Sequence, residues 1–163
     1  MMRQFIFSFL LLLSYSTQSA FAELTVVLVD QDSISYELGP SKYANSPTKY
    51  DNSFSKYDNS VSKYANSPSK YDNSPSKYDN SSGKNRLYTQ DRKVVGYAVY
   101  SSDGVLNIFS LSGTRLGYVP AGNHTQSIFA SESPIWCGTR AMLNGKLVIG
   151  LTKSCYYRLL SDQ

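Results

Sequence analysis

The sequence predicts a small, mostly β protein in which an antiparallel meander closes into a barrel, a sandwich or a flower-like sheet. Three observations predict it. Residues 86–160 divide into short runs rich in β-branched and aromatic residues, with turn pairs such as Asp103-Gly104 and Asn144-Gly145 between them. A further run of this kind, Leu24–Val29, lies near the N-terminus. The six heptads between these regions form a repeat that is either disordered or weakly solenoidal.

The N-terminus has the layout of a cleavable secretory signal peptide over residues 1–22. A basic start containing Arg3 precedes the apolar run Phe5–Leu13, and Ala20 and Ala22 place small residues before an expected cleavage at Glu23. The apolar run is shorter than the roughly 20 residues that span a bilayer. We therefore expect a secreted or periplasmic protein without a membrane span.

The cleaved chain would carry 15 basic and 12 acidic side chains, because Arg3 is lost with the leader. This mild positive balance, together with the expected compartment, makes nucleic acid an unlikely partner. Within the cleaved chain, residues 23–40 form an N-terminal segment whose run Leu24–Val29 is typical of a strand buried on both faces. We expect it to join the sheet of the C-terminal β-domain, residues 83–163.

Residues 41–82 consist of six heptads of the form S/T-K-Y-A/D-N-S-x. A coiled coil is excluded because most heptads hold one large side chain and three contain proline. A straight strand is excluded because an odd period would place successive tyrosines on opposite faces. Two alternatives remain: a disordered spacer, which the low aliphatic content favours, and a shallow solenoid that stacks Tyr on Tyr and Asn on Asn.

Either alternative presents evenly spaced Lys-Tyr pairs that suit multivalent contacts. The candidate binding surface comprises the six repeat tyrosines and the single tryptophan: Tyr43, Tyr50, Tyr57, Tyr64, Tyr71, Tyr78 and Trp136. The expected partners are cell-surface polysaccharide or other copies of the chain. Deletion of residues 41–82 is expected to weaken these contacts and to leave the β-domain folded.

The β-domain is expected to contain eight short strands. They are residues 86–90, 94–100, 105–111, 114–119, 126–131, 135–143, 147–152 and 156–160. A two-residue turn at Ser112-Gly113 would pair Phe109 with Leu116 and Leu106 with Val119. A two-residue turn at Asn144-Gly145 would pair Met142 with Leu147 and place Trp136 on the same face as Ile149 and Leu151.

The same register places Cys137 opposite Thr152, three residues short of Cys155. An exported chain with two cysteines is expected to form one disulfide. At about 3.3 Å per residue, Cys155 is too far along a straight strand to reach Cys137. The bond therefore requires a bulge, or a bend of the chain near Lys153-Ser154.

A Gly-Tyr pair occurs at Gly96-Tyr97 and again 21 residues later at Gly117-Tyr118, which indicates a duplicated hairpin unit. With the heptads, this block over residues 41–120 resembles bacterial exported proteins that join Asn-Ser-rich heptads to a small β-domain. It also resembles, more faintly, the four-fold β-flower family. The resemblance implies a compact β-domain and carries over no catalytic residue.

The sequence offers little for catalysis. His124 is the single histidine and lies in a turn, so it cannot form a zinc site alone, and no Gly-x-Ser-x-Gly elbow is present. We predict no catalytic residue, no metal and no cofactor. The expected function is that of a non-enzymatic envelope or secreted protein acting by surface binding or self-association. The alternative is a small secreted enzyme or enzyme inhibitor acting on cell-wall material, with the repeat as a spacer; a cleft holding two carboxylates or His124 would favour it.

Overall fold

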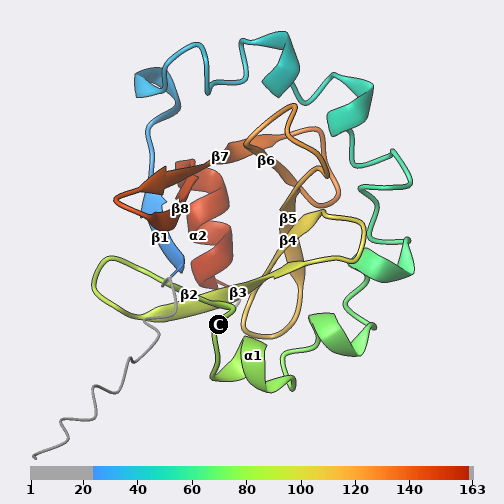
Figure 1. Cartoon of the computed structure of the whole chain (residues 1–163). Helices are drawn as coiled ribbons and strands as arrows, with labels where there is room; N and C mark the ends of the chain where they lie inside the picture. Colours follow the sequence, from blue (N-terminus) through green and yellow to red (C-terminus); the bar gives the residue numbers. More distant parts are fainter. Residues whose placement is uncertain (1–23, 162–163) are drawn as a thin grey trace, which may run out of the picture.

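The computed structural model describes residues 24–161, which form a closed barrel of eight strands with a long ordered segment around it (Figure 1). Strands β2 to β8 follow one another as an antiparallel meander, and β1 closes the barrel between β2 and β8, parallel to both. This confirms the mostly β class and the closing meander, and it places Leu24–Leu28 in the same sheet. The strands are β1 (Leu24–Leu28), β2 (Arg86–Tyr88), β3 (Val94–Tyr100), β4 (Leu106–Phe109), β5 (Arg115–Val119), β6 (Ser127–Ala130), β7 (Trp136–Leu143) and β8 (Lys146–Leu151).

The barrel interior is filled by aliphatic side chains and by the C-terminal helix α2 (Lys153–Ser161). Figure 1 shows α2 in the middle of the ring of strands, and its Leu159 is fully buried among residues such as Ile108 and Ile149. The cavity left between α2 and the strands measures only about 20 Å³. An eight-stranded barrel has a narrow interior. Here α2 and the strand side chains fill it, so the space between them is too small for a ligand.

The prediction of a strand over residues 156–160 is wrong, because these residues belong to α2. Their apolar positions fit a helix: Cys155 and Leu159 are four residues apart, as are Tyr156 and Leu160, and all four contact the interior core. The chain turns after Thr152, and this turn brings Cys155 back over Cys137. The disulfide forms as expected from the bend, with the two Cα atoms 5.5 Å apart.

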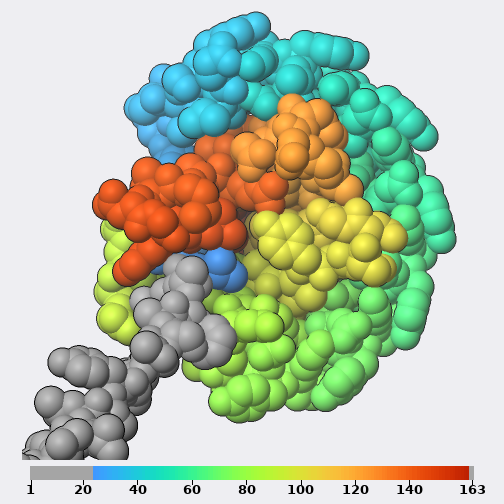
Figure 2. Space-filling view, viewed as in Figure 1, coloured from blue at the N-terminus to red at the C-terminus, as the bar shows by residue number. Residues whose placement is uncertain are grey.

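Residues 41–82, called the belt from here on, run around the outside of the barrel (Figures 1 and 2). Topology requires a long connection, because β1 and β2 are parallel neighbours and the chain must return to the same end of the barrel. Figure 1 shows that the connection does not cross one face; it passes β7, β6, β5, β4 and β3 before it reaches β2.

Each heptad of the belt forms one tight turn. The short helical turns of the belt are η2 (Tyr43–Asn45), η3 (Tyr50–Asn52), η4 (Tyr64–Asn66), η5 (Tyr71–Asn73) and α1 (Tyr78–Ser81). One further turn, η1 (Gln31–Ser33), precedes the belt. In every heptad the Asn backbone amide donates to the Lys carbonyl three residues earlier, at 2.8–3.0 Å. The serine that follows and the hydroxyl residue two positions later bond to each other in the first five heptads, for example Ser53 with Ser55 at 2.7 Å.

The belt is therefore ordered, and the disordered alternative is wrong. The ordered alternative correctly gave one turn per heptad, but the turns stack against the barrel and not on a core of their own. The physical reason is that the asparagines find hydrogen-bond partners on both the belt and the barrel. We also no longer expect the β-domain to fold without residues 41–82. The belt connects β1 to β2, and it covers aromatic clusters on the outer face of the barrel.

The two hairpins follow the predicted registers over most of their length. Met142 pairs with Leu147, and Leu106 pairs with Val119, as expected. Phe109 pairs with Arg115 and not with Leu116, because the register shifts by one residue after Ile108.

Trp136 does not share a face with Ile149 and Leu151. It lies in an outer cluster with Tyr118 and Phe129, whereas Ile149 and Leu151 lie in the interior core. The reason is an irregularity in the pairing of β6 with β7, where Phe129 pairs with Trp136 and Ile128 pairs with Gly138. The extra residue, Cys137, breaks the alternation of the two faces.

Candidate functional site

The inner side of the belt is a row of six asparagines, all 0–5% exposed. Each side-chain amide donates to two backbone carbonyls, eight and six residues earlier; Asn66, for example, donates to Asp58 at 2.8 Å and to Ser60 at 3.1 Å. Asparagine is suited to this because its amide nitrogen has two hydrogens and its oxygen remains free to accept a bond from the barrel. The row therefore fastens each heptad to the preceding one.

The barrel in turn bonds to the belt at successive strands, moving from β6 towards β2. Side chains of the barrel domain bond to the asparagine side-chain oxygen or to its backbone carbonyl. The contacts are Thr125 to Asn45 (2.8 Å), His124 to Asn52 (3.0 Å), Tyr118 to the Asn52 carbonyl (2.7 Å), Arg115 to the Asn59 carbonyl (2.9 Å), Asn107 to Asn66 (3.4 Å), Tyr97 to the Asn73 carbonyl (2.8 Å) and Asn85 to Asn80 (2.7 Å).

The two Gly-Tyr pairs have equivalent roles in this arrangement. Tyr97 and Tyr118 are buried, and each phenol donates to an asparagine carbonyl of the belt. The preceding glycines allow the next strand to approach closely, since a Cβ at Gly96 would lie 2.3 Å from the Phe109 carbonyl oxygen and one at Gly117 would lie 2.7 Å from that of Phe129. The duplicated unit thus forms two anchoring points for the belt.

The outer side of the belt and the segment just before it carry exposed tyrosines, which we call the phenol row. Its members are 63–72% exposed: Tyr36, Tyr43, Tyr50, Tyr57, Tyr64, Tyr71 and Tyr78. Tyr36 was missed by the sequence interpretation, which began the repeat at Ser41. A signal was present, because Tyr36 and Pro40 lie seven residues before Tyr43 and Pro47, and Asn45 bonds to the carbonyls of Glu37 and Gly39 in the same way as the later asparagines bond.

Lysine ammonium groups lie between the phenols. In three heptads the Lys Nζ atom lies 5.6–5.9 Å from the centre of the preceding tyrosine ring, a cation–π distance. Four of the six lysines also pair with the acidic residue five positions earlier, as Lys56 pairs with Asp51 at 2.9 Å. The other two, Lys49 and Lys70, follow an alanine at that spacing and lie near the aspartate two positions later. The pairing of Lys56 with Asp51 lowers the pKa of Asp51 and raises that of Lys56. The outer face therefore alternates exposed rings with ammonium groups whose positions are fixed by carboxylates.

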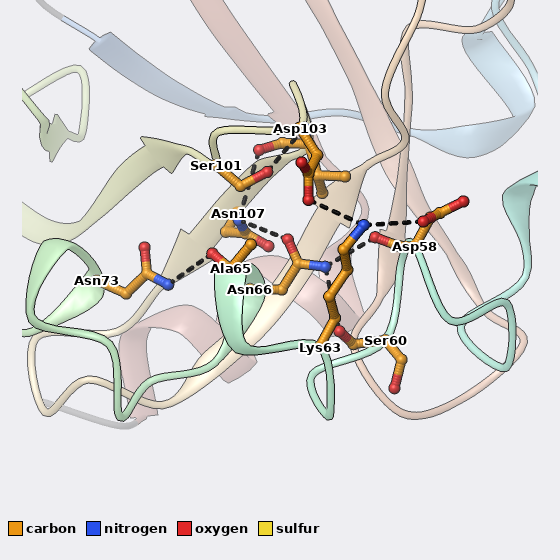
Figure 3. Close-up of polar contacts among 10 residues, drawn as sticks. Asp58, Ser60, Lys63, Ala65, Asn66, Asn73, Ser101, Asp103 and Asn107 are labelled. Carbon is orange, nitrogen blue, oxygen red and sulfur yellow. Dashed lines mark hydrogen bonds and ion pairs between the residues drawn. The ribbon is translucent and has the colours of Figure 1, made fainter.

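Lys63 connects this outer face to the barrel, as Figure 3 shows. Its Nζ atom lies 2.8 Å from Asp58 of the belt and 2.9 Å from Asp103 in the turn between β3 and β4. Hydrogen bonds to Asp103 and Asp58 raise the pKa of Lys63, so the ammonium form is favoured. In the same view Asn66 bonds to Asn107, and both contacts hold the fourth heptad against β4.

A cleft of about 390 Å³ lies where the second and third heptads meet the loops after β3 and β5. Its polar lining includes three carboxylates, two lysines and one imidazole: Asp51, Asp58, Asp103, Lys56, Lys63 and His124. Neighbouring lysines lower the pKa of Asp51 and of Asp58, so both carboxyl groups are ionised at neutral pH. A general acid for glycoside cleavage requires a raised pKa, which these two groups do not have.

His124 in this cleft forms a hydrogen bond with Asn52 of the belt. The Asn52 amide nitrogen is already committed to the carbonyls of Ala44 and Ser46, so the Asn52 oxygen accepts and His124 Nε2 donates. Partial burial and the charge of Lys49 lower the pKa of His124 below its ordinary value of 6.5. The imidazole is therefore neutral at pH 7 and acts as an anchor of the second heptad.

The structure separates the predicted site residues into two groups. The six repeat tyrosines all lie on the exposed outer side of the belt. Trp136 does not join them, because it is 5% exposed and packs beneath the belt; its assignment to the binding surface is wrong. Cys137 and Cys155 form the disulfide. The signal-cleavage residues Ala20, Ala22 and Glu23 lie outside the described residues.

Comparison with known proteins returns no match: no protein-family model, curated protein or solved structure corresponds to this chain. Within residues 24–161, no group of three or more His, Cys, Asp and Glu side chains is placed to hold a metal ion. No helix among these residues has the length and apolar character needed to cross a membrane.

Proposed function

We propose that this chain is an exported, non-enzymatic binding protein of the cell envelope or the surrounding medium, which contacts polysaccharide or other copies of itself through the phenol row. The observation that carries the proposal is that two side chains of each heptad lie on opposite sides of the belt. The asparagines are buried and hold the belt to the barrel, whereas the tyrosines are exposed and none of them belongs to a hydrophobic core cluster.

The variation among the heptads supports this view. The fourth position changes between Ala and Asp, and the seventh holds Pro, Phe, Val or Ser, whereas Tyr occupies the third position in all six heptads and again at Tyr36. Exposed rings gain little from folding, and a run of exposed aromatic side chains is typical of a contact surface. The lysines beside the rings add attraction for anionic groups.

The shape of the belt restricts the partner. The belt curves around the barrel, so its tyrosines face outward in different directions (Figures 1 and 2). A flat rigid surface can contact only neighbouring members of the phenol row. A flexible linear polymer that bends around the rim, or several molecules arranged around it, can occupy more of them. Binding of a polymer should therefore strengthen with chain length until the rim is spanned.

The test replaces all seven tyrosines of the phenol row with serine. The fold should be retained because none of these rings is buried, and binding to an array of neutral and acidic polysaccharides, or self-association measured by sedimentation velocity, should weaken by more than about 10-fold because a multivalent contact is lost. Tyr157→Ser, at an exposed tyrosine outside the belt, is the matched control and should bind as the parent protein does. If the seven-serine protein binds every polysaccharide and itself as the parent does, the proposal is wrong.

The cleft beside His124 is the specific observation that favours the second candidate, a small enzyme or enzyme inhibitor acting on cell-wall material. A cleavage assay on the parent protein, the seven-serine protein and an Asp58→Asn variant distinguishes the two candidates. Release of new reducing ends from a polysaccharide, unchanged in the seven-serine protein and lost in Asp58→Asn, would favour the enzyme. Binding without cleavage, lost in the seven-serine protein, favours the binding protein.

A further inference from the structure

Arg115 of β5 is a buried cation, 4% exposed, on the side of the barrel that the belt covers. Its Nε donates to the Asn107 side-chain oxygen at 2.7 Å, and its Nη1 donates to the Asn59 carbonyl at 2.9 Å. The guanidinium also lies 4.7 Å from the centre of the Tyr118 ring. These partners orient the group, but all of them are neutral.

No carboxylate within residues 24–161 forms an ion pair with Arg115. The negative charge of Glu132 acts on the guanidinium only from beyond ion-pair distance. Its Nη2 atom is buried and has no hydrogen-bond partner among the same residues. Burial lowers the pKa of Arg115 to about 10, which still leaves it charged at neutral pH. A buried charge is costly unless an opposite charge or hydrogen bonds compensate it, and this one is compensated only in part.

A cavity of about 320 Å³ adjoins Arg115, between the belt and the turn that joins β4 to β5. Hydroxyl residues Ser112, Thr114 and Ser131 contribute to its lining, together with two charged residues, Arg158 of α2 and Glu132. With Arg115, the lining carries two positive charges and one negative charge. Guanidinium and hydroxyl donors around one space are the groups that bind carboxylate, sulfate and phosphate oxygens.

We propose that this cavity binds an oxyanion, with Arg115 and Arg158 as its charged ligands and the neighbouring hydroxyls as further donors. The site goes beyond the phenol row, which lies on the opposite, outer side of the belt. It is assembled by belt and barrel together, since Val61 and Pro68 complete the lining and the Asn59 carbonyl orients the guanidinium. A bound oxyanion would place a counter-charge in direct contact with Arg115 and fasten the third and fourth heptads more firmly to the barrel.

The test titrates the full chain with sodium sulfate against sodium chloride at constant ionic strength, and follows binding by calorimetry and by the melting temperature. Sulfate should bind saturably and raise the melting temperature, whereas chloride should not. Arg158→Gln should weaken sulfate binding at least 5-fold, and Glu132→Gln should strengthen it, because the two changes alter the charge of the cavity in opposite directions. Both side chains are exposed, so these variants keep the fold in a way that substitution of the buried Arg115 would not guarantee.

Two further arms identify the source of the oxyanion. Glucuronate and a sulfated oligosaccharide are compared with inorganic sulfate: tighter binding of either one indicates an oxyanion carried on a glycan, and tighter binding of inorganic sulfate indicates a free ion. The proposal is overturned if sulfate behaves as chloride does, or if the Arg158→Gln and Glu132→Gln proteins bind sulfate as the parent does. The seven-serine protein should retain sulfate binding, so failure of the phenol-row proposal would not be mistaken for failure of this one.

Discussion

Deletion of the fourth heptad, residues 62–68, is expected to lower the free energy of unfolding by more than about 5 kcal/mol, which is enough to unfold many domains of this size. The deletion removes Asn66, which bonds to β4, and Lys63, which pairs with the turn after β3. It also shortens a connection that has to reach around the barrel from β1 to β2, so another heptad would have to uncoil. Urea unfolding followed by circular dichroism measures the loss.

Insertion of one extra SKYDNSP heptad at the same place is the matched control. An added heptad can bulge into solvent, and a longer loop costs only about 1 kcal/mol or less in closure entropy. A large loss on deletion with a small loss on insertion indicates that the length of the belt is fitted to the circumference of the barrel. Equal tolerance of both changes would contradict this conclusion.

The second large effect is expected from Asn66→Asp, a change of nearly constant volume. Asn66 is fully buried, and its amide nitrogen lies 2.8 Å from the Asp58 carbonyl oxygen and 3.1 Å from that of Ser60. An aspartate there would place a carboxylate against two carbonyl oxygens, and the third hydrogen-bond partner of this position, Asn107, carries no positive charge to compensate. We expect a loss of about 3–5 kcal/mol at pH 7, the range for an uncompensated buried charge.

Ala65→Asp supplies the same charge one residue earlier and should have almost no effect, within about 0.5 kcal/mol. Four heptads already carry Asp at this position, and Lys70 would stand five residues later, as Lys56 does from Asp51. If Ala65→Asp is as damaging as Asn66→Asp, negative charge anywhere on the belt would explain the loss. If neither change matters, the asparagine row does not hold the belt.

The sequence was sufficient for the features that depend on local patterning. Short runs rich in β-branched and aromatic residues, separated by turn pairs, predicted the meander, and the Asn144-Gly145 turn gave the correct register of β7 with β8. From that register followed the need for a bend near Lys153, which the structure shows as the start of α2. The bend itself contained the signal for a helix in the spacing of Cys155 and Leu159, but the predicted strand took no account of it.

The order of the belt could not be predicted in the same way, because a heptad contains no core of its own. Its stabilising partners lie far away in the sequence: Asn73 bonds to Tyr97, 24 residues later, and Asn45 bonds to Thr125, 80 residues later. The composition shows that such a segment lacks aliphatic residues. It does not show that side chains of the neighbouring barrel will form hydrogen bonds with the asparagines. The burial of Trp136 was hidden for a similar reason, since it depends on one irregular residue in the pairing of β6 with β7.

Quenching of Trp136 fluorescence by acrylamide tests most directly whether the repeat is a belt folded onto the barrel. Trp136 is the single tryptophan of the chain, and Phe54 of the belt packs against its cluster on the outer face of the barrel. A belt in place predicts blue-shifted emission and a quenching constant several-fold lower in the native protein than in urea. A native quenching constant equal to that of the unfolded chain would show that the outer face of the barrel is open to solvent. It would contradict the conclusion that the repeat is folded onto the barrel.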